Sequence, residues 1–124
     1  APDRLVIATL GDGAYIFANP VAGHYASHQN DLPILTVVFN NGMWNAVRRS
    51  TLTVYPDGYA AKSNSQVLSE LAGLPAFEDV CTASGGYGER VEDPAQLPAA
   101  LARAIKVVMQ EKRQALLNVI CQPR

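Results

Sequence analysis

The stretch that decides the fold is residues 4–13, RLVIATLGDG. Its run from Leu5 to Leu10 is almost entirely apolar and rich in β-branched residues, which is typical of a strand covered on both faces in a parallel sheet. We therefore predict a strand over residues 4–10 and a tight turn at Gly11-Asp12-Gly13. Because a central strand seldom opens a domain, we expect the domain to be N-terminally truncated.

Strands and helices alternate outward from this stretch. Asn19-Pro20 predicts the start of a helix that ends near Asn30, with Asn19 as its N-cap, and Asp93-Pro94 repeats this signature before the predicted helix at 94–112. The other predicted elements are a buried strand at 33–39, a helix at 44–50, a loop at 51–65, short helices at 66–71 and 75–83, a strand at 88–91, an amphipathic helix at 94–112 and a strand at 115–121. This order predicts an α/β fold with an open, mostly parallel sheet flanked by helices in three layers.

Composition limits the classes of function. The chain has 124 residues, with 10 basic and 11 acidic side chains spread evenly, so we predict one globular domain over residues 1–124. The absence of a basic stripe argues against nucleic-acid binding, and no apolar run approaches the roughly 20 residues that cross a bilayer. We therefore expect a cytoplasmic protein without a membrane partner. Cys81 and Cys121 have no Cys or His at metal-ligand spacing and are interpreted as buried thiols.

The ends of the first two predicted strands carry polar residues. Ligands of open α/β sheets gather at the carboxyl ends of the strands. Asp12 lies at the first of these ends, and Asn40-Asn41-Gly42 lies at the second. If the strands are neighbours, oxygens of Asp12 and Asn41 could converge with a backbone carbonyl on Mg²⁺, and the Gly13 and Ala14 amides could bind a phosphate.

Gly11-Asp12-Gly13 alone is a common turn, and Asn40-Asn41-Gly42 alone is a common strand exit. Their combination is more specific, because 26 residues, Ala14 through Phe39, separate them and contain a capped helix and a strand. This spacing resembles the thiamine diphosphate fingerprint of the diphosphate-binding domain in the decarboxylase and acetolactate synthase superfamily. Residues 77–94 and 115–119 are also similar to the end of that domain, so the resemblance covers nearly the whole chain. It is closest to benzoylformate decarboxylase-like members.

The resemblance implies thiamine diphosphate and Mg²⁺ as cofactors. It implies Asp12 and Asn41 as metal ligands through their side chains, and Met43 through its backbone carbonyl. A cation and oriented amides would neutralise the diphosphate without a basic cluster, which suits so neutral a chain. The implied cofactor-binding residues are Gly11, Asp12, Gly13, Ala14, Asn41, Met43 and Trp44.

The resemblance also bears on the substrate, a 2-oxo acid that is decarboxylated or whose remaining carbanion is ligated to a carbonyl. Pyruvate decarboxylase-like members carry an acidic residue where this chain has Val47, and acetolactate synthases carry Trp at the position of Ser50. Residues 40–49 look closer to benzoylformate decarboxylase and related carboligases, in which Val47 would line the substrate pocket.

The resemblance implies that no catalytic residue lies in this chain. The cofactor's aminopyrimidine ring would be bound by upstream residues, and an activating glutamate would come from another domain, usually of a partner subunit. We therefore expect a fragment of a longer multidomain enzyme, inactive alone and forming a homodimer or homotetramer at full length.

Two other functions stay open at this point. One is a non-catalytic relative that serves as a regulatory or assembly subunit, and the other is a general phosphate- or nucleotide-binding α/β module in which Gly-Asp-Gly is fortuitous.

Three further features have competing interpretations. His24 and His28, one helical turn apart, could chelate zinc, but packing or solvent-facing histidines are expected because no third ligand accompanies them. Arg48-Arg49 and Lys62 could cover a carboxylate substrate. The alternative interpretation is a solvated loop whose two tyrosines pack on the domain. Trp44 could form a pocket wall or a core edge. The stripe from Leu97 to Val108 is predicted to be core.

Overall fold

The structure is a computed structural model that describes residues 3–122. Its helices and strands follow one another along the chain as follows: β1 (Ile7–Gly11), α1 (Asp12–Phe17), α2 (Pro20–Gln29), β2 (Leu35–Asn40), α3 (Asn45–Val54), α4 (Tyr59–Ser63), α5 (Phe77–Ala83), β3 (Tyr87–Val91), the 3₁₀ helix η1 (Pro94–Gln96), α6 (Leu97–Gln110) and β4 (Ala115–Ile120). The predicted alternation of strands and helices is confirmed.

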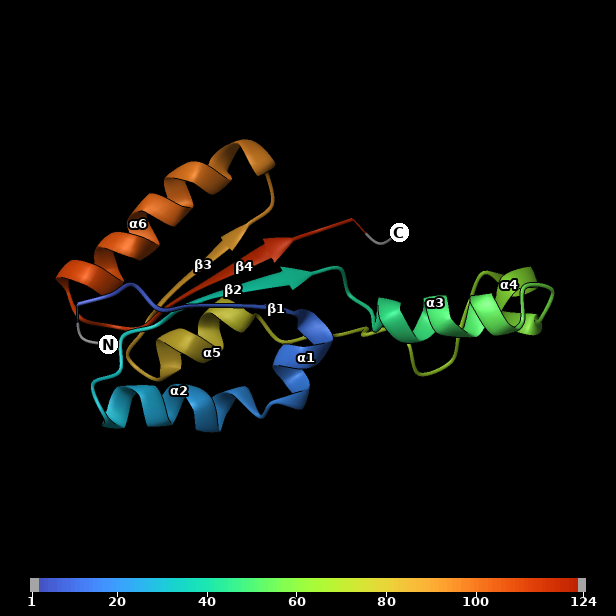
Figure 1. Cartoon of the computed structure of the whole chain (residues 1–124), viewed down its shortest axis with the longest axis horizontal. Coiled ribbons are helices and arrows are strands. Elements are labelled where there is room, and N and C mark those ends of the chain that lie inside the picture. Colours follow the sequence, from blue (N-terminus) through green and yellow to red (C-terminus); the bar gives the residue numbers. More distant parts are fainter. Residues whose placement is uncertain (1–2, 123–124) are drawn as a thin grey trace.

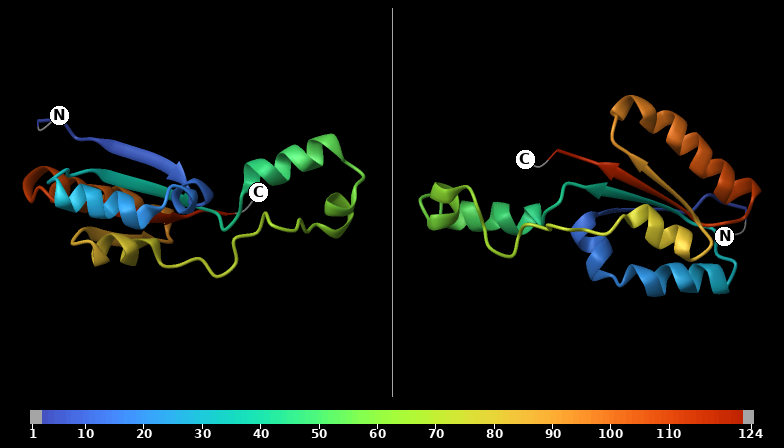
Figure 2. Two further views of the ribbon diagram at one scale, coloured as in Figure 1. Left: turned by 90° about the horizontal axis from the view of Figure 1, so that it is seen from below. Right: turned by 180° about the vertical axis from the view of Figure 1, so that it is seen from behind.

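The four strands form one parallel sheet in the order β1-β2-β4-β3 (Figure 1). In the register, Leu35 lies opposite both Ile7 and Ala115. Helix α6 covers one face of the sheet, while α1, α2 and α5 lie on the other face (Figure 2). The predicted fold class, an open parallel sheet flanked by helices, is therefore confirmed.

Two apolar clusters fill the space between these layers. The first joins α6 to one face of the sheet, so the predicted core role of the α6 stripe is confirmed. The second lies under α1 and α5. The fully or nearly buried residues of the second cluster are Tyr15, Val38, Phe77, Cys81 and Leu116. Burial of such side chains supplies about 1.5–3 kcal/mol each relative to exposure, so the two clusters hold the layers together.

Helices α3 and α4 extend away from the body, beyond the carboxyl ends of the strands (Figures 1 and 2). We call residues 45–68, which include both helices, the arm. Neither helix contains a buried residue, and Tyr59 is 81% exposed. The predicted loop at 51–65 is wrong, because α3 continues to Val54 and α4 forms within it. The expectation that the two tyrosines, Tyr55 and Tyr59, pack on the domain is also wrong.

Three further local predictions are wrong. The Gly11–Gly13 segment is not a tight turn, because α1 begins at Asp12 directly after β1. Residues 66–71 form turns and an isolated bridge between Met43 and Glu70, not a helix. β1 is not covered on both faces: Ile7 is 49% exposed, because β1 is an edge strand of the described sheet and alternates between exposed and partly buried residues.

The two predicted helix caps differ. Asp93 caps its helix as expected, since its Oδ1 accepts a hydrogen bond of 2.9 Å from the Ala95 amide. Asn19 precedes α2 in a left-handed conformation, φ 53°, and its side chain caps nothing. The start of α2 therefore depends on Pro20 at the first helical position, where a missing N–H costs nothing.

The two cysteines lie in different environments. Cys81 is buried, and burial raises the pKa of its thiol to about 12. Cys121 is only partly buried, so the interpretation of both as buried thiols is correct for Cys81 alone. Within the described residues, no helix is both long and apolar enough to span a membrane.

An ion pair between β3 and α6 makes stability depend on pH. Arg103 donates to both carboxylate oxygens of Glu89, and these hydrogen bonds lower the pKa of Glu89. A lowered folded-state pKa stabilises the fold above the unfolded glutamate pKa of about 4.3, and the contribution is lost as the pH falls through the folded value.

We therefore expect Arg103→Leu to lower the free energy of unfolding at pH 7 relative to the parent, and the difference to shrink as the pH falls below about 4. Denaturant unfolding at a series of pH values measures this. Lys106→Leu, which removes an exposed cation from the same helix, is the matched control. A difference between Arg103→Leu and the parent that stays constant from pH 7 to 3 would contradict the assignment.

Candidate functional site

The ends of β1 and β2 bring the two sequence triplets together. Asp12 begins α1 directly after β1, and Gly42 follows β2 in the adjacent strand. The Gly42 amide donates a hydrogen bond of 2.6 Å to Asp12 Oδ2. Side chain and backbone from positions 30 residues apart therefore meet at the carboxyl edge of the sheet.

The carboxylate of Asp12 is buried without a counter-charge. It is 3% exposed, and among residues 3–122 it forms no ion pair. Its partners are the Gly42 amide and the Gly13 amide, which donates to Oδ1 over 2.8 Å. A buried anion held only by neutral donors is costly. A cation bound at this position would offset that cost, so the environment of Asp12 fits a metal ligand.

The loop after β2 offers two further oxygens. Asn41 Oδ1 accepts a hydrogen bond of 3.1 Å from the Met43 amide, and the Met43 carbonyl accepts one of 2.9 Å from the Asn45 amide. Each oxygen keeps a second lone pair. Carboxylate, side-chain amide and backbone carbonyl oxygens are the hard ligands that Mg²⁺ takes. The donor set therefore suits magnesium and not a soft metal.

The base of this loop is held against the chain that returns from the arm. The Leu71 amide donates a hydrogen bond of 2.8 Å to the Gly42 carbonyl, and the Trp44 amide donates one of 2.8 Å to the Ser69 carbonyl. Gly42 has φ +70°, a conformation that glycine adopts without strain. These contacts fix the backbone on both sides of Met43.

Trp44 packs on Gly13. A Cβ at position 13 would overlap the indole ring, so only glycine allows this approach. Trp44 is 37% exposed and lies at the edge of the site. The structure therefore brings the two motifs into contact a second time, through this aromatic ring.

The remaining predicted site residues surround this contact. Gly11 is the extended residue before α1, and Ala14 lies in the first helical turn, where amides have no partner within the helix. Val47 lies on α3 and is about half exposed. An apolar hollow of about 530 Å³ lies at the opposite end of the sheet from Val47, between Val6, Leu32 and Val108.

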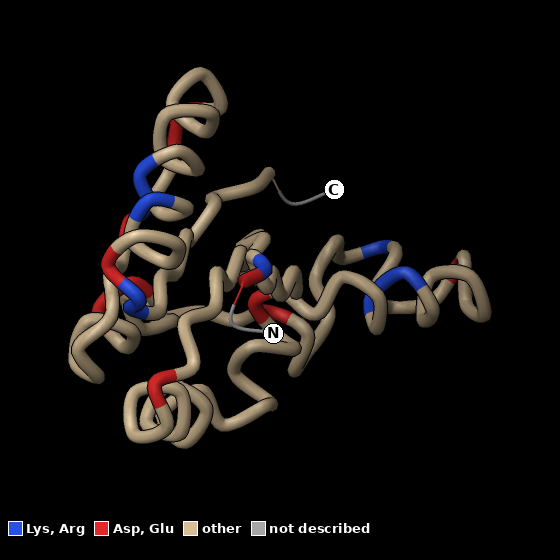
Figure 3. The backbone as a smooth tube through the Cα atoms, turned by 60° about the vertical axis from the view of Figure 1, so that its left-hand side comes forward, with Lys and Arg blue, Asp and Glu red and all other residues tan. Residues whose placement is uncertain are grey.

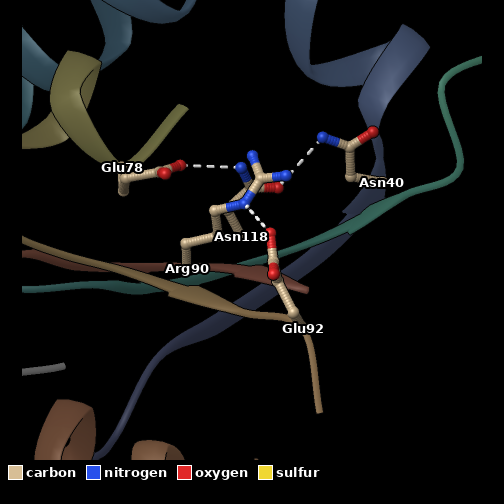
Figure 4. A network of polar contacts seen from close by, with 5 residues as sticks. All are labelled: Asn40, Glu78, Arg90, Glu92 and Asn118. Atoms are coloured by element: carbon tan, nitrogen blue, oxygen red, sulfur yellow. Dashed lines mark hydrogen bonds and ion pairs between the residues drawn. The ribbon is translucent and has the colours of Figure 1, made fainter. Parts of the chain in front are cut away.

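A buried polar network that none of the sequence motifs predicts lies beneath the site (Figure 4). Asn118 of β4 contacts Asn40 of β2 and Glu78 of α5, and Arg90 pairs with Glu92 close by. The signal was available, because Asn118 is an amide within an otherwise apolar strand, ALLNVI. The motifs that follow the strands do not include this residue, because it lies within a strand.

The two histidines have structural surroundings. His24 is buried between Tyr15 Oη, 2.7 Å from Nε2, and Gln114 Oε1, 2.8 Å from Nδ1. Gln114 Oε1 can only accept, so Nδ1 carries the proton and Tyr15 donates to Nε2. Burial raises the pKa of Tyr15, which keeps that donor neutral. His28 is exposed, and the described residues hold no cluster of three metal-ligating side chains.

Figure 3 shows that basic and acidic residues both occur along the chain, with no segment of one sign alone dominating, as the sequence predicts. On the arm, Arg48 donates a hydrogen bond of 2.6 Å to Asn64 Oδ1. Arg48 therefore ties α3 to the segment after α4.

A buried carboxylate, an oxygen-rich loop and the first-turn amides of α1 lie together at the carboxyl edge of a parallel sheet, an arrangement that fits a metal-bound diphosphate. Comparison with known proteins agrees. Residues 1–119 match the family described as "Thiamine pyrophosphate enzyme, C-terminal TPP binding domain". The chain therefore belongs to this family of thiamine diphosphate-binding domains, whose cofactors are thiamine diphosphate and Mg²⁺, as expected.

Similar proteins include a probable acetolactate synthase of Mycobacterium bovis, 31% identical over 122 residues, which are 98% of this chain and 20% of that protein. A 2-hydroxyacyl-CoA lyase of Oryza sativa is 31% identical over 126 residues, with 98% and 20% covered. A solved structure, the thiamine diphosphate-dependent 4-hydroxybenzoylformate decarboxylase of Rhodococcus jostii RHA1, has a TM-score of 0.72 at 19% identity and covers 100% of this chain and 20% of that one. The chain thus spans about a fifth of these relatives.

Proposed function

We propose that this chain binds the magnesium–diphosphate end of thiamine diphosphate within an enzyme that decarboxylates 2-oxo acids or ligates the product to a carbonyl. The observation that carries the proposal is the 2.6 Å contact between the Gly42 amide and the buried Asp12 carboxylate. It joins the two motifs at one point. The general nucleotide-binding alternative gains no support from the family match.

The proposed metal ligands are Asp12 and Asn41 through side-chain oxygens and Met43 through its carbonyl. The Gly13 and Ala14 amides would hold the diphosphate, and the Gly13 amide would exchange its bond to Asp12 for one to a phosphate oxygen. Gly11 and Trp44 would border the cofactor. When bound, thiamine diphosphate supplies an electron sink for the charge left on the substrate carbon.

The substrate belongs to the same proposal. The names of similar proteins describe an acetolactate synthase, a 2-hydroxyacyl-CoA lyase and a sulfoacetaldehyde acetyltransferase. We propose Val47 as an apolar wall of the 2-oxo acid pocket, because it is exposed on α3 three residues beyond Trp44. An apolar wall excludes proton transfer at this position.

The rest of the active site is proposed to come from elsewhere. Residues 1–124 would form one diphosphate-binding domain, completed by other domains of the same chain and by a second subunit. The arm supports this, because its two helices bury no residue within the described chain. A cytoplasmic setting agrees with two free cysteines. The chain alone should form no product, and turnover by it would contradict this division of the site.

Calorimetric titration with thiamine diphosphate tests the proposal. We expect binding in the presence of Mg²⁺ and none in the presence of a chelator, because two neighbouring anionic groups, the diphosphate and Asp12, repel without the cation. Affinity will be modest, since the chain provides contacts to one end of the cofactor only. Binding that is indifferent to Mg²⁺, or no binding at millimolar cofactor, would contradict the proposed site.

A further inference from the structure

The side chain of Asn118 is buried in the middle of β4. It is 0% exposed, and its strand is otherwise apolar. A buried amide is costly unless both of its ends are hydrogen-bonded. Here both ends are hydrogen-bonded. Asn118 Oδ1 accepts a hydrogen bond of 3.1 Å from Asn40 Nδ2, and Asn118 Nδ2 donates one of 2.7 Å to Glu78 Oε2.

From Asn118 the hydrogen bonds continue to the site. Asn40 Oδ1 accepts a hydrogen bond of 3.1 Å from the Gly42 amide, the same amide that donates to Asp12 Oδ2. A continuous path therefore runs from α5 through β4 and β2 into the loop that contains Asn41 and Met43; Figure 4 shows its side-chain part. We call Glu78, Asn118 and Asn40 the amide relay.

The two ends of the amide relay demand the same orientation of both amides. A carboxylate can only accept, so Glu78 requires the Nδ2 end of Asn118 and turns its oxygen toward Asn40. At the other end, the Gly42 N–H can only donate and requires the oxygen of Asn40. The Nδ2 end of Asn40 then faces Asn118, as observed. Glu78 thus decides which group is presented to the Gly42 amide.

We propose that Asn118, oriented by Glu78, is a positioning residue for the magnesium site. It holds Asn40, and Asn40 holds the Gly42 amide between the two ligands Asn41 and Met43. This inference rests on the proposed function, because it assigns a role toward the metal. Groups that orient metal ligands in this way change metal affinity by about 10–100-fold when they are removed.

The test exchanges donor and acceptor between Asn118 and Glu78 in two steps, first at Asn118 alone and then at both residues. Asn118→Asp keeps an acceptor for Asn40 but places a second carboxylate against Glu78, so we expect the Mg²⁺ concentration at half-saturation to rise about tenfold. Adding Glu78→Gln supplies a donor to the new carboxylate and should restore the parent value. Asn118→Leu should weaken Mg²⁺ binding equally, and Glu78→Gln should not rescue it.

Two readouts are measured besides thermal unfolding. Fluorescence of Trp44, the chain's one tryptophan, follows Mg²⁺ titration at fixed thiamine diphosphate, because its indole packs on Gly13. Amide hydrogen exchange at Gly42 without any ligand reports the loop directly, and it should quicken in Asn118→Asp and return with Glu78→Gln.

Unchanged Mg²⁺ half-saturation in both single variants, or failure of the rescue, would overturn the amide relay while leaving the proposed function in place. Losses of affinity that simply follow the melting temperature would also overturn it, since they indicate general destabilisation. If the parent itself gives no Mg²⁺-dependent response, the proposed function fails and this inference fails with it.

Discussion

The Asp12→Asn variant is expected to lose magnesium-dependent binding of thiamine diphosphate, with affinity reduced at least about 100-fold. The change removes the negative charge from a side chain that is 3% exposed while keeping its shape and an oxygen that can accept from a peptide amide. Mg²⁺ takes charged oxygens in preference to neutral ones, and Asp12 is the sole carboxylate among the proposed ligands. Calorimetric titration with and without chelator measures the loss.

Asp79→Ala is the matched control for this variant. Asp79 is an exposed carboxylate on α5, outside the proposed site, so its removal should leave affinity within about twofold of the parent. Thermal unfolding of Asp12→Asn should stay close to that of the parent, because two effects oppose each other: the buried charge is removed, but the new NH2 group faces one of the two peptide N–H donors of Gly13 and Gly42. Parent-like affinity in Asp12→Asn would contradict the metal assignment.

The Gly88→Ala variant is expected to lose about 3 kcal/mol or more of the free energy of unfolding. Gly88 lies on β3 under the first turn of α5, and a Cβ there would overlap the backbone carbonyl of Glu78. Backbone cannot rotate aside as a flexible side chain can, so α5 would have to separate from the sheet. Denaturant unfolding measures the change.

Gly23→Ala provides the opposite result with the same substitution. A Cβ at Gly23, within α2, meets nothing within 4 Å, and alanine is favoured over glycine in a helix interior. We expect this variant to gain about 0.5–1 kcal/mol. Equal effects of the two substitutions would show that α5 does not rest on β3 as closely as described.

The order of elements and the parallel sheet were predictable because the signals are local. Largely apolar runs specified β1, β2 and β4, and Pro20 and Asp93 marked helix starts. The arm was predictable only in part, as the helix at 44–50. Although α3 is amphipathic, neither α3 nor α4 buries a residue, and the loop-like Pro56-Asp57-Gly58 concealed the end of α3 and the whole of α4.

The candidate site likewise has one part that local sequence predicts and another that only the tertiary structure brings together. The spacing of the two motifs was enough to propose Asp12 and Asn41, and the resemblance carried by that spacing added Met43. It could not show the amide relay, since Glu78, Asn118 and Asn40 come from three elements and meet only when β2 and β4 pair and α5 covers them. Periodicity and motifs are properties of neighbours in the chain. The orientation of a buried amide is decided by neighbours in space, where each donor must find an acceptor.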